Sequence, residues 1–376
     1  MTDVQTCGQR RYPASTKVAV VVSGWPRVSE TFALNELLAL HDNGMLAAVF
    51  ATKAGDTSLV QPGWKTLDPL VTVLPDVPVP EQGALVAQAL QPHGVSAVHG
   101  YFAHQPAAVA ADAAERLGIP YSFSVHALDA RKVAPDELAR RASGAAVVVA
   151  CNHDSAAAIE AVGVAPTLLP HGVDLGRFTM SPPPSGTDVR LLAVGRLVEK
   201  KGFIHLVEAL AELPQHVTLR LIGDGPERDR LGSAAARAGV AERCEFLGRR
   251  THEELPALFA SADIVVVPSV VDRNGDRDGL PNVVLEAMAS ARPVIASDVA
   301  AIATAVRPTS DADGPATGLL VPSADPRALA RAIGELVVDP IRRCRLGRQA
   351  RAHAERHFDL GQCSARFCNL LELTHG

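Results

Sequence analysis

Short runs of Val, Ile and Leu alternate with Ala-, Leu-, Glu- and Arg-rich stretches along nearly the whole chain. The runs are apolar at almost every position, which is typical of strands covered on both faces of a parallel sheet. The stretches between them have helical spacing, so the pattern predicts repeated βαβ units. The predicted strands lie at 17–22, 46–51, 71–74, 96–99, 121–125, 146–150, 189–194, 217–222, 244–247, 264–267, 293–296 and 318–321.

The length of the chain and one proline-rich segment predict two domains. At roughly 150 residues per domain, 376 residues correspond to two. The segment SPPPSGTD, 181–188, contains three consecutive prolines, which cannot continue a helix or a central strand. We therefore expect a Rossmann-like domain over 1–180, a proline-rich hinge over 181–188 and a second Rossmann-like domain over 189–357. The predicted fold class is α/β, with two doubly wound domains facing across a cleft.

Composition excludes several classes of protein. The chain is 47% hydrophobic and 20% charged, so it can bury two cores. Its formal net charge of -5 argues against nucleic-acid binding. The six cysteines contain no CxxC pair, so the spacing suggests neither a zinc site nor a redox motif. No run of eighteen apolar residues occurs and the first seventeen residues are polar, so we expect a cytoplasmic protein without strong membrane association. The oligomeric state is left open.

A cationic loop follows the strand predicted at 189–194. Gly195 ends this strand, and Arg196 and Lys201 come next within one short loop. Ligands of open α/β sheets bind outside the carboxyl ends of the strands. An Arg fork and a mobile Lys at such a place suit a phosphate or diphosphate. Solvated charges at the start of a helix are the alternative interpretation.

A second segment, DGLPNVVLE, places two carboxylates around a predicted helix N-terminus. Gly279 and Pro281 open this helix, whose first backbone N–H groups are available to an anion. Asp278 lies just before it, and Glu286 lies eight residues further on. One acid can accept hydrogen bonds from the hydroxyls of a donor sugar and the other from a ribose diol. A capping acid and an ordinary helical Glu are the alternative.

With these two segments in place, the chain resembles the family 4 glycosyltransferases, which are retaining GT-B enzymes that use nucleotide sugars. The resemblance covers nearly the whole chain, and the order and spacing of the motifs match. The motifs are GRLVEKKG (195–202), LIGDGPERDRL (221–231), FLGRRTHEELPALFASADIVVVPS (246–269), DGLPNVVLEAMASARPVIASD (278–298) and GLLVPSADPRALARAI (318–333). The segments SGWPRVSETF (23–32) and SFSVHALD (122–129) resemble the branch that assembles polysaccharides.

The resemblance implies a catalytic set of His126, Arg196, Lys201 and Asp278. Arg196 and Lys201 match the pair that neutralises the donor diphosphate, and His126 matches the active-site histidine at a strand end. Asp278 and Glu286 match the acids of the E-x(7)-E signature, which contact the transferred sugar and the ribose. Asp stands at 278 where Glu is usual, which leaves the identity of the donor sugar open.

The remaining implied residues divide between donor and acceptor. Donor binding is assigned to Arg196 and Lys201 together with Gly24, Gly223, Arg250, Gly279, Leu280, Pro281, Asn282, Val283 and Glu286. Acceptor-binding candidates are Arg27, Ser29, Glu30, Phe102, His104 and Asp129. His171 in LPHGVD occupies a position where the family often has Asn, and we assign it to interdomain structure. The stretch 358–376 resembles the helix that crosses back to the first domain in this fold.

The predicted function is metal-independent and cofactor-free transfer, with retention, of a hexose or N-acetylhexosamine. The donor is a nucleoside diphosphate sugar, with UDP- preferred to GDP-, and the acceptor is a hydroxyl of a small molecule, such as an aminocyclitol or another natural product, or of a saccharide. A transferase for polysaccharides or lipid-linked oligosaccharides and a non-catalytic sugar-nucleotide-binding protein are the alternatives. A GT-B epimerase or phosphorylase fits the Arg, Lys and acid set less well. A nicotinamide-dependent dehydrogenase is disfavoured because no G-x-G-x-x-G follows any predicted strand.

Overall fold

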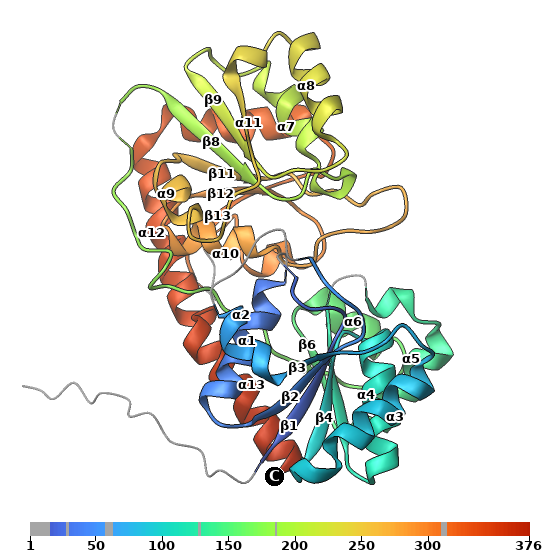
Figure 1. Ribbon diagram of the computed structural model, residues 1–376. Coiled ribbons are helices and arrows are strands. Elements are labelled where there is room, and N and C mark those ends of the chain that lie inside the picture. The colour runs from blue at the N-terminus through green and yellow to red at the C-terminus, as the bar shows by residue number, and fades with distance from the viewer. Residues whose placement is uncertain (1–15, 28–29, 57–62, 127–128, 185, 310–313) are drawn as a thin grey trace, which may run out of the picture. The chain divides into compact units, whose positions relative to one another are not determined.

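Two sheets flanked by helices organise the chain (Figure 1). The computed structural model describes residues 16–27, 30–56, 63–126, 129–184, 186–309 and 314–376. Packing divides the chain into two units. The first unit comprises Met1–Ser124, Val133–Val149 and Ser364–Gly376, and the second unit comprises Val125–Lys132 and Ala150–Cys363.

The first sheet has seven strands in the order β3-β2-β1-β4-β5-β6-β7. Its strands are β1 (Val18–Val22), β2 (Leu46–Ala51), β3 (Val71–Val73), β4 (Ala97–Tyr101), β5 (Tyr121–Val125), β6 (Val148–Ala150) and β7 (Thr167–Leu168). The pairs β2–β3, β1–β2, β1–β4 and β4–β5 are parallel. The helices of this part of the chain are α1 (Thr31–Asp42), α2 (Trp64–Leu67), α3 (Val79–Leu90), α4 (Gln105–Leu117), α5 (Pro135–Gly144) and α6 (His153–Glu160).

The second sheet has six strands in the order β10-β9-β8-β11-β12-β13, and every neighbouring pair is parallel. Its strands are β8 (Val189–Val194), β9 (Val217–Ile222), β10 (Cys244–Gly248), β11 (Ile264–Val267), β12 (Val294–Ser297) and β13 (Gly318–Val321). The helices that follow are α7 (Phe203–Leu210), α8 (Arg228–Arg237), α9 (Leu255–Ala260), α10 (Asn282–Ala289), α11 (Pro326–Val338), α12 (Pro340–His357) and α13 (Leu360–His375).

The apolar runs form strands because both of their faces are buried. In β8, Leu191 packs into one apolar cluster and the next residue, Leu192, packs into another. Ile264 and Val265 of β11 divide between the same two clusters. Successive strand side chains point to opposite faces, so a sheet with a core on each side needs apolar residues at consecutive positions. All the predicted strands are confirmed, with ends that shift by up to two residues, and β7 was missed because it has only two residues.

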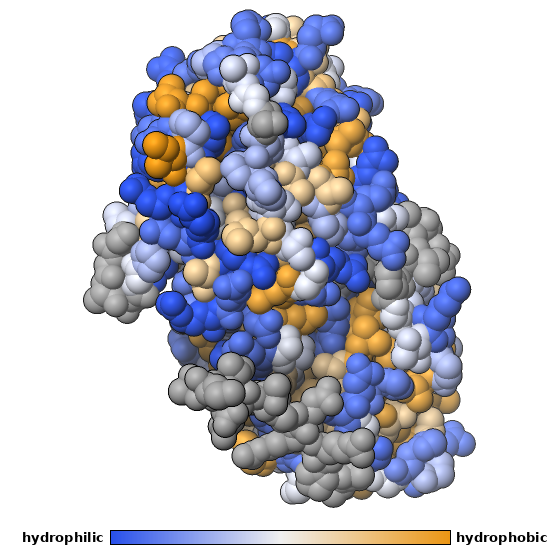
Figure 2. Space-filling view, turned by 90° about the vertical axis from the view of Figure 1, so that its left-hand side faces the viewer, coloured by the Kyte–Doolittle hydropathy of each residue, from blue (hydrophilic) through white to orange (hydrophobic). Residues whose placement is uncertain are grey.

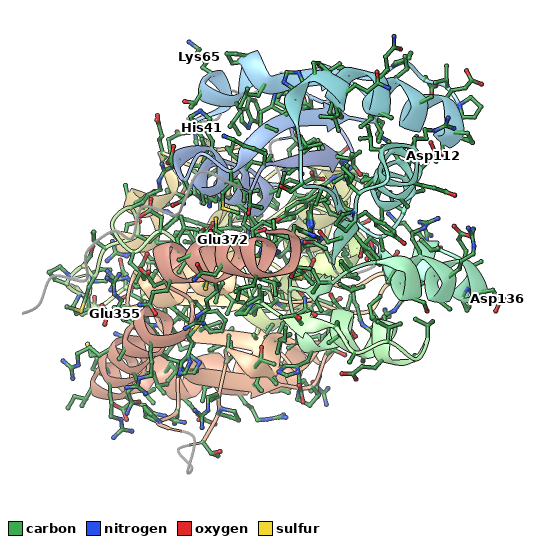
Figure 3. The ribbon with its side chains drawn as sticks, turned by 90° about the horizontal axis from the view of Figure 1, so that it is seen from below. His41, Lys65, Asp112, Asp136, Glu355 and Glu372 are labelled. Atoms are coloured by element: carbon green, nitrogen blue, oxygen red, sulfur yellow. The ribbon has the colours of Figure 1, made fainter. Side chains whose placement is uncertain are left out.

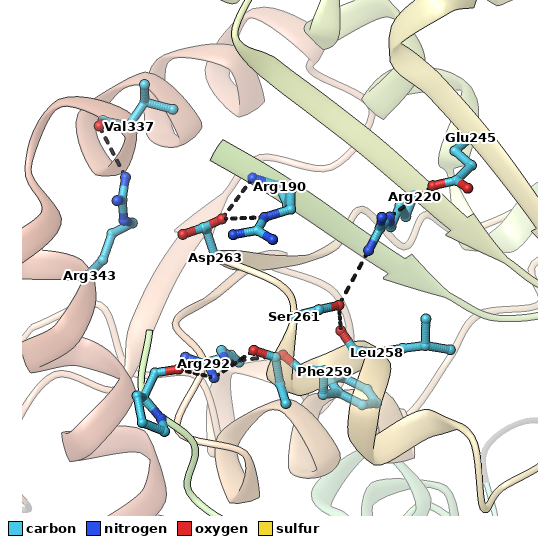
Figure 4. A network of polar contacts seen from close by, with 12 residues as sticks. Arg190, Arg220, Glu245, Leu258, Phe259, Ser261, Asp263, Arg292, Val337 and Arg343 are labelled. Atoms are coloured by element: carbon cyan, nitrogen blue, oxygen red, sulfur yellow. Dashed lines mark hydrogen bonds and ion pairs between the residues drawn. The ribbon is translucent and has the colours of Figure 1, made fainter. Parts of the chain in front are cut away.

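Charged side chains lie on the outer faces of helices (Figure 3), and an Arg–Asp contact lies at the amino-terminal edge of the second sheet. Charged side chains such as Lys65 and Asp136 lie on outer helix faces (Figure 3), and apolar residues on the face drawn in Figure 2 form separate patches. At the starts of β8 and β11, the Asp263 carboxylate accepts hydrogen bonds from the Arg190 backbone N–H (2.9 Å) and Nε (3.4 Å) (Figure 4). Because the strands are parallel, their carboxyl ends all lie at the opposite edge of the sheet, and the candidate site is at that edge.

The first residues of the predicted hinge lie within the second unit and are hydrogen-bonded to its core. The buried Arg292 guanidinium donates to the carbonyls of Ser181 (3.1 Å) and Pro182 (3.0 Å), and also to those of Phe259 and Ala260 (Figure 4). These contacts fix the first two residues of the segment 181–188. Movement about that segment stays a prediction.

Candidate active site

The candidate donor site lies at the carboxyl edge of the second sheet, where glycines lie at or just after the ends of three neighbouring strands. The N–H of Gly195, after β8, donates to the Ile222 carbonyl (2.9 Å), and the N–H of Gly223 donates to Gly248, the last residue of β10 (2.8 Å). Gly223 has a φ of +136°, and a Cβ there would lie 1.9 Å from the Gly195 carbonyl oxygen. Only glycine lets these two loops approach so closely.

The predicted cation and acid of the donor site form a direct ion pair. Lys201 Nζ lies 2.8 Å from Asp278 Oδ2, and Ser269 Oγ donates to the same oxygen at 2.8 Å. Lys200 Nζ lies 3.8 Å from Asp278 Oδ1 and 3.1 Å from Asp276 Oδ2. Burial alone raises the pKa of the Asp278 carboxyl, but Lys201, Lys200 and the Ser269 hydroxyl together outweigh burial and hold this pKa below its usual value. Asp278 is therefore an anion at neutral pH.

The helix expected after Asp278 begins at Asn282, with Pro281 as its N-cap. Pro281 has no side-chain acceptor for the first N–H groups, and Val284 N–H bonds to its carbonyl at 3.0 Å. The start of α10, preceded by Gly279 and Leu280, thus presents backbone donors and the positive end of the helix dipole beside Lys201.

Gly279 is required by a close approach from another loop. A Cβ at this position would lie 2.5 Å from Asn152 Nδ2. The Asn152 side chain is itself held in place, because its Oδ1 accepts a hydrogen bond from Ser155 N–H (2.9 Å) at the start of α6. Two residues before Gly279, the Arg277 guanidinium pairs with Asp154 of α6. The loop 277–279 is therefore anchored from α6.

The second acid, Glu286, is oriented by a histidine that the sequence analysis did not single out. Arg177 Nη1 donates to His252 Nδ1 at 2.9 Å, so the ring proton lies on Nε2, which is 3.3 Å from Glu286 Oε1. Phe178 packs edge-on against the His252 ring, with 5.4 Å between centroids. Ser269 and His252 both lie within FLGRRTHEELPALFASADIVVVPS, but the partners of His252 are 34 and 75 residues away and Ser269 belongs to no motif pair, so no spacing identified them.

The remaining donor-site cations are exposed. Arg196 is exposed directly after Gly195 and makes no ion pair within the described part of the chain. Arg250 is also exposed, and its Nη1 lies 3.5 Å from Glu254 Oε1. Arg196 is therefore available to an anionic ligand, whereas Lys201 starts from a pair with Asp278.

Hydrogen bonds join His126 to Asp129 after β5. The Asp129 Oδ1 accepts hydrogen bonds from the N–H groups of His126 (2.7 Å) and Ala130 (2.9 Å), and the Asp129 N–H donates to the His126 carbonyl (2.9 Å). This pattern fixes the backbone that carries the His126 ring, which is 7% exposed. His171 stacks on that ring, with 5.0 Å between centroids and 4° between planes.

The other candidates belong to the first unit. Arg27 Nε lies 3.1 Å from Glu30 Oε1, and burial raises the pKa of Glu30 to about 7 although Arg27 opposes the shift. Phe102 and His104 stack with 5.6 Å between centroids, and His104 Nε2 lies 3.4 Å from Ser23 Oγ. Gly24 follows Ser23 in the chain, and the Lys53 carbonyl oxygen lies 3.4 Å from the position that a Cβ added to Gly24 would take. Ser29 lies outside the described residues.

Comparisons with known proteins agree with this arrangement. Residues 188–339 match the family described as glycosyl transferases group 1, and residues 29–177 match the one described as glycosyltransferase family 4. A GDP-mannose-dependent monoacylated alpha-(1-6)-phosphatidylinositol monomannoside mannosyltransferase of Corynebacterium glutamicum is 32% identical over 232 residues, 56% of this chain and 58% of that protein. A putative colanic acid biosynthesis glycosyltransferase, WcaL of Salmonella typhimurium, is 27% identical over 379 residues, 85% of this chain and 90% of that protein. The chain thus spans little more than half the length of the Corynebacterium protein.

A solved structure shares the fold. Anabaena HepE in complex with UDP superposes with a TM-score of 0.80 at 22% identity, covering 95% of this chain and all of that one. Two parallel-sheet α/β domains of this kind define the GT-B class, which confirms the predicted fold class. The chain belongs to the family 4 glycosyltransferases. Among the helices of the described residues, none combines the length and the apolar character needed to cross a membrane.

Proposed function

We propose that the chain is a retaining glycosyltransferase that moves a hexose or N-acetylhexosamine from a nucleoside diphosphate sugar to a hydroxyl group. The observation that carries this proposal is the arrangement of Lys201, Asp278 and Glu286 around the start of α10. A diphosphate at that helix start meets backbone donors, Lys201 and the exposed Arg196. Glu286, positioned by His252, then receives the ribose hydroxyls.

Departure of the diphosphate is the step that this charge arrangement favours. As the bond from the anomeric carbon to the diphosphate oxygen breaks, negative charge grows on the phosphate, and preorganised donors stabilise it. The acceptor oxygen attacks the same face of the sugar, and its proton passes to the leaving phosphate oxygen. His126 orients the sugar near its hydroxymethyl group. Asp278 contacts the sugar while it shares Lys201 with the diphosphate.

We further propose that no divalent metal takes part. Asp276, Arg277 and Asp278 form a D-x-D triplet, the pattern with which other glycosyltransferases hold a metal. Here the two carboxylates pair with lysines instead, Asp276 with Lys200 at 3.1 Å and Asp278 with Lys201 at 2.8 Å. An ammonium at each carboxylate supplies the positive charge that a metal would otherwise bring.

Donor and acceptor are proposed by class. We place UDP-sugars first and GDP-sugars second, and the GDP-mannose dependence of the Corynebacterium relative keeps the second open. For the acceptor we propose a small cyclic polyol, such as an aminocyclitol or another natural product, or a saccharide. Burial raises the pKa of Glu30 to about 7, so a cationic acceptor beside Glu30 would make this carboxyl fully ionised. A polysaccharide or lipid-linked acceptor is the alternative, favoured by the likeness to WcaL.

Thermal unfolding with UDP, GDP, ADP and TDP, each with and without EDTA, tests the donor proposal. A ligand at 100 times its Kd stabilises a folded protein by about 2.7 kcal/mol. We expect one diphosphate to raise Tm equally in both series. If no diphosphate raised the Tm of the folded protein, the sugar-nucleotide proposal would be overturned. A Tm rise that EDTA abolished would contradict metal independence alone.

Replacement of Lys201 or Arg196 by Ala tests the role of the loop after β8. We expect each variant to lose at least a hundredfold in kcat, because charge on the leaving diphosphate is stabilised only in the transition state. Turnover of the matching UDP- or GDP-sugar is the measurement, and Arg237→Ala on the exposed face of α8 is the control. Activity within tenfold of wild type for either site variant would remove the diphosphate role.

A further inference from the structure

Three neighbouring strands of the first sheet end in side chains that ligate soft metal ions. His126 follows β5 directly, Cys151 follows β6 directly, and His171 lies three residues after β7. These strands are consecutive in the sheet, and Cys151 N–H donates to the Val125 carbonyl at 3.3 Å. The topology therefore gathers three ligands that are 25 and 20 residues apart, which no sequence motif reveals.

The ligand atoms of these residues lie close together. One ring nitrogen of each histidine and the Cys151 sulfur are within 4.8 Å of one another, and no other trio of His, Cys, Asp or Glu in the described residues is comparably close. Zinc sits about 2.0–2.1 Å from nitrogen and about 2.3 Å from sulfur, so tetrahedral ligand atoms stand roughly 3.3–3.8 Å apart. Because the His126 and His171 rings are stacked nearly parallel, closing the site around an ion requires the half-buried His171 ring to rotate until its nitrogen points at the ion.

The surroundings favour metal binding by the sulfur. Asn152 Nδ2 lies 3.2 Å from Cys151 Sγ and can donate to a thiolate, while Oδ1 of the same residue is held by Ser155 N–H. Such a neighbouring donor orients a ligand and supports its charged form. His126 is buried and the other two ligands are half-buried, so the set is shielded but reachable. Thiolate and imidazole select zinc and similar ions over magnesium, calcium or manganese.

We propose that His126, Cys151 and His171 form a binding site for one zinc-like transition-metal ion, and that occupancy of this site inhibits the enzyme. The first half stands on geometry alone. The second half rests on the proposed function, because a metal-bound His126 ring cannot orient the donor sugar. Transfer proceeds in EDTA, and zinc at low concentration stops it.

Cobalt titration of the EDTA-treated full chain tests the binding half. Cobalt replaces zinc in such sites, and a thiolate ligand produces a charge-transfer band in the near ultraviolet. We expect saturation at one cobalt per chain and displacement of cobalt by zinc. Cys151→Ser should abolish the thiolate band, His171→Asn should weaken cobalt binding at least tenfold, and Cys244→Ser, a half-buried cysteine on β10, should match wild type. Absence of the band in wild type, or its persistence in Cys151→Ser, would overturn the site.

Transferase assays with and without zinc test the inhibition half. We expect zinc to inhibit wild type and Cys244→Ser, EDTA to reverse the inhibition, and His171→Asn to keep its activity and lose at least tenfold in zinc sensitivity. Cobalt binding with undiminished transfer would refute inhibition. Cobalt binding by a chain that shows no transfer and binds no nucleoside diphosphate would support the metal site and overturn the proposed function, so the two failures are distinguishable.

Discussion

At the residue scale, Asp278 shows how one carboxylate can serve both stability and the candidate site. Its side chain is 9% exposed and that of Lys201 is 17% exposed, so each depends on the other for compensation of its charge. Both residues are predictable from their motifs. Their direct pairing is not, because they lie 77 positions apart and meet only where the loops after β8 and β11 converge.

Asp278→Asn removes one partner of this largely buried pair. We expect the free energy of unfolding to fall by about 3 kcal/mol at pH 7, because the Lys201 ammonium stays behind. Since the folded pKa of Asp278 is lowered, its contribution is present above the unfolded pKa near 3.9 and is lost as pH falls below that value. Urea denaturation at pH 7 measures the effect, with the exposed Asp188→Asn as control. Equal midpoints for the two variants would contradict a stabilising pair.

At the element scale, the alternation of apolar runs and helical stretches was sufficient to predict the strands. Runs such as 264–267 must be covered on both faces, and two packed helix layers are the structure that achieves this. The motif glycines predicted loops, but not which backbone they touch. Gly223 against the Gly195 carbonyl, and Gly279 against Asn152, become apparent only once neighbouring strands are aligned.

Gly223→Ala tests the close approach of the loops after β8 and β9. We expect it to lower the free energy of unfolding by about 3 kcal/mol, because the added Cβ would meet the Gly195 carbonyl and the φ of +136° disfavours any other residue. Gly334→Ala is the control. This glycine lies inside α11 with nothing within 4 Å of an added Cβ, so Ala should stabilise by about 0.5–1 kcal/mol. Chemical denaturation of both variants is the measurement, and a Gly223→Ala protein as stable as wild type would refute the contact.

At the scale of the whole molecule, a buried polar chain in the first unit makes stability depend on pH. His99 bonds through Nδ1 and Nε2 to Ser122 (2.8 Å) and Ser124 (2.9 Å), and His375 Nε2 bonds to the same Ser122 hydroxyl (3.0 Å). Burial, with a smaller effect of His375, lowers the pKa of His99 to about 3, and burial lowers the pKa of His375 to about 4. Both rings are therefore neutral in the folded protein near pH 7.

We expect acid to unfold the first unit at pH values where exposed histidines have little effect. Unfolded histidine binds a proton near pH 6.5, so stability is greatest above that pH and falls, by about 1.4 kcal/mol per pH unit for each group, until the folded pKa is reached. Denaturation at pH 7 and pH 5 should show a smaller difference for His99→Gln than for wild type. The exposed His93→Gln serves as control, and an unchanged difference in His99→Gln would refute the assignment.

The sequence by itself determined the strands, the two α/β domains and the motif residues of the donor site, because apolar periodicity and turn residues act over short distances along the chain. Only the tertiary structure decided which of these residues meet. Lys201 with Asp278, His252 with Glu286, and the trio of His126, Cys151 and His171 each join separate loops. Their proximity follows from strand order within a sheet, which local pattern does not encode, since long-range pairing depends on how all the buried faces pack at once.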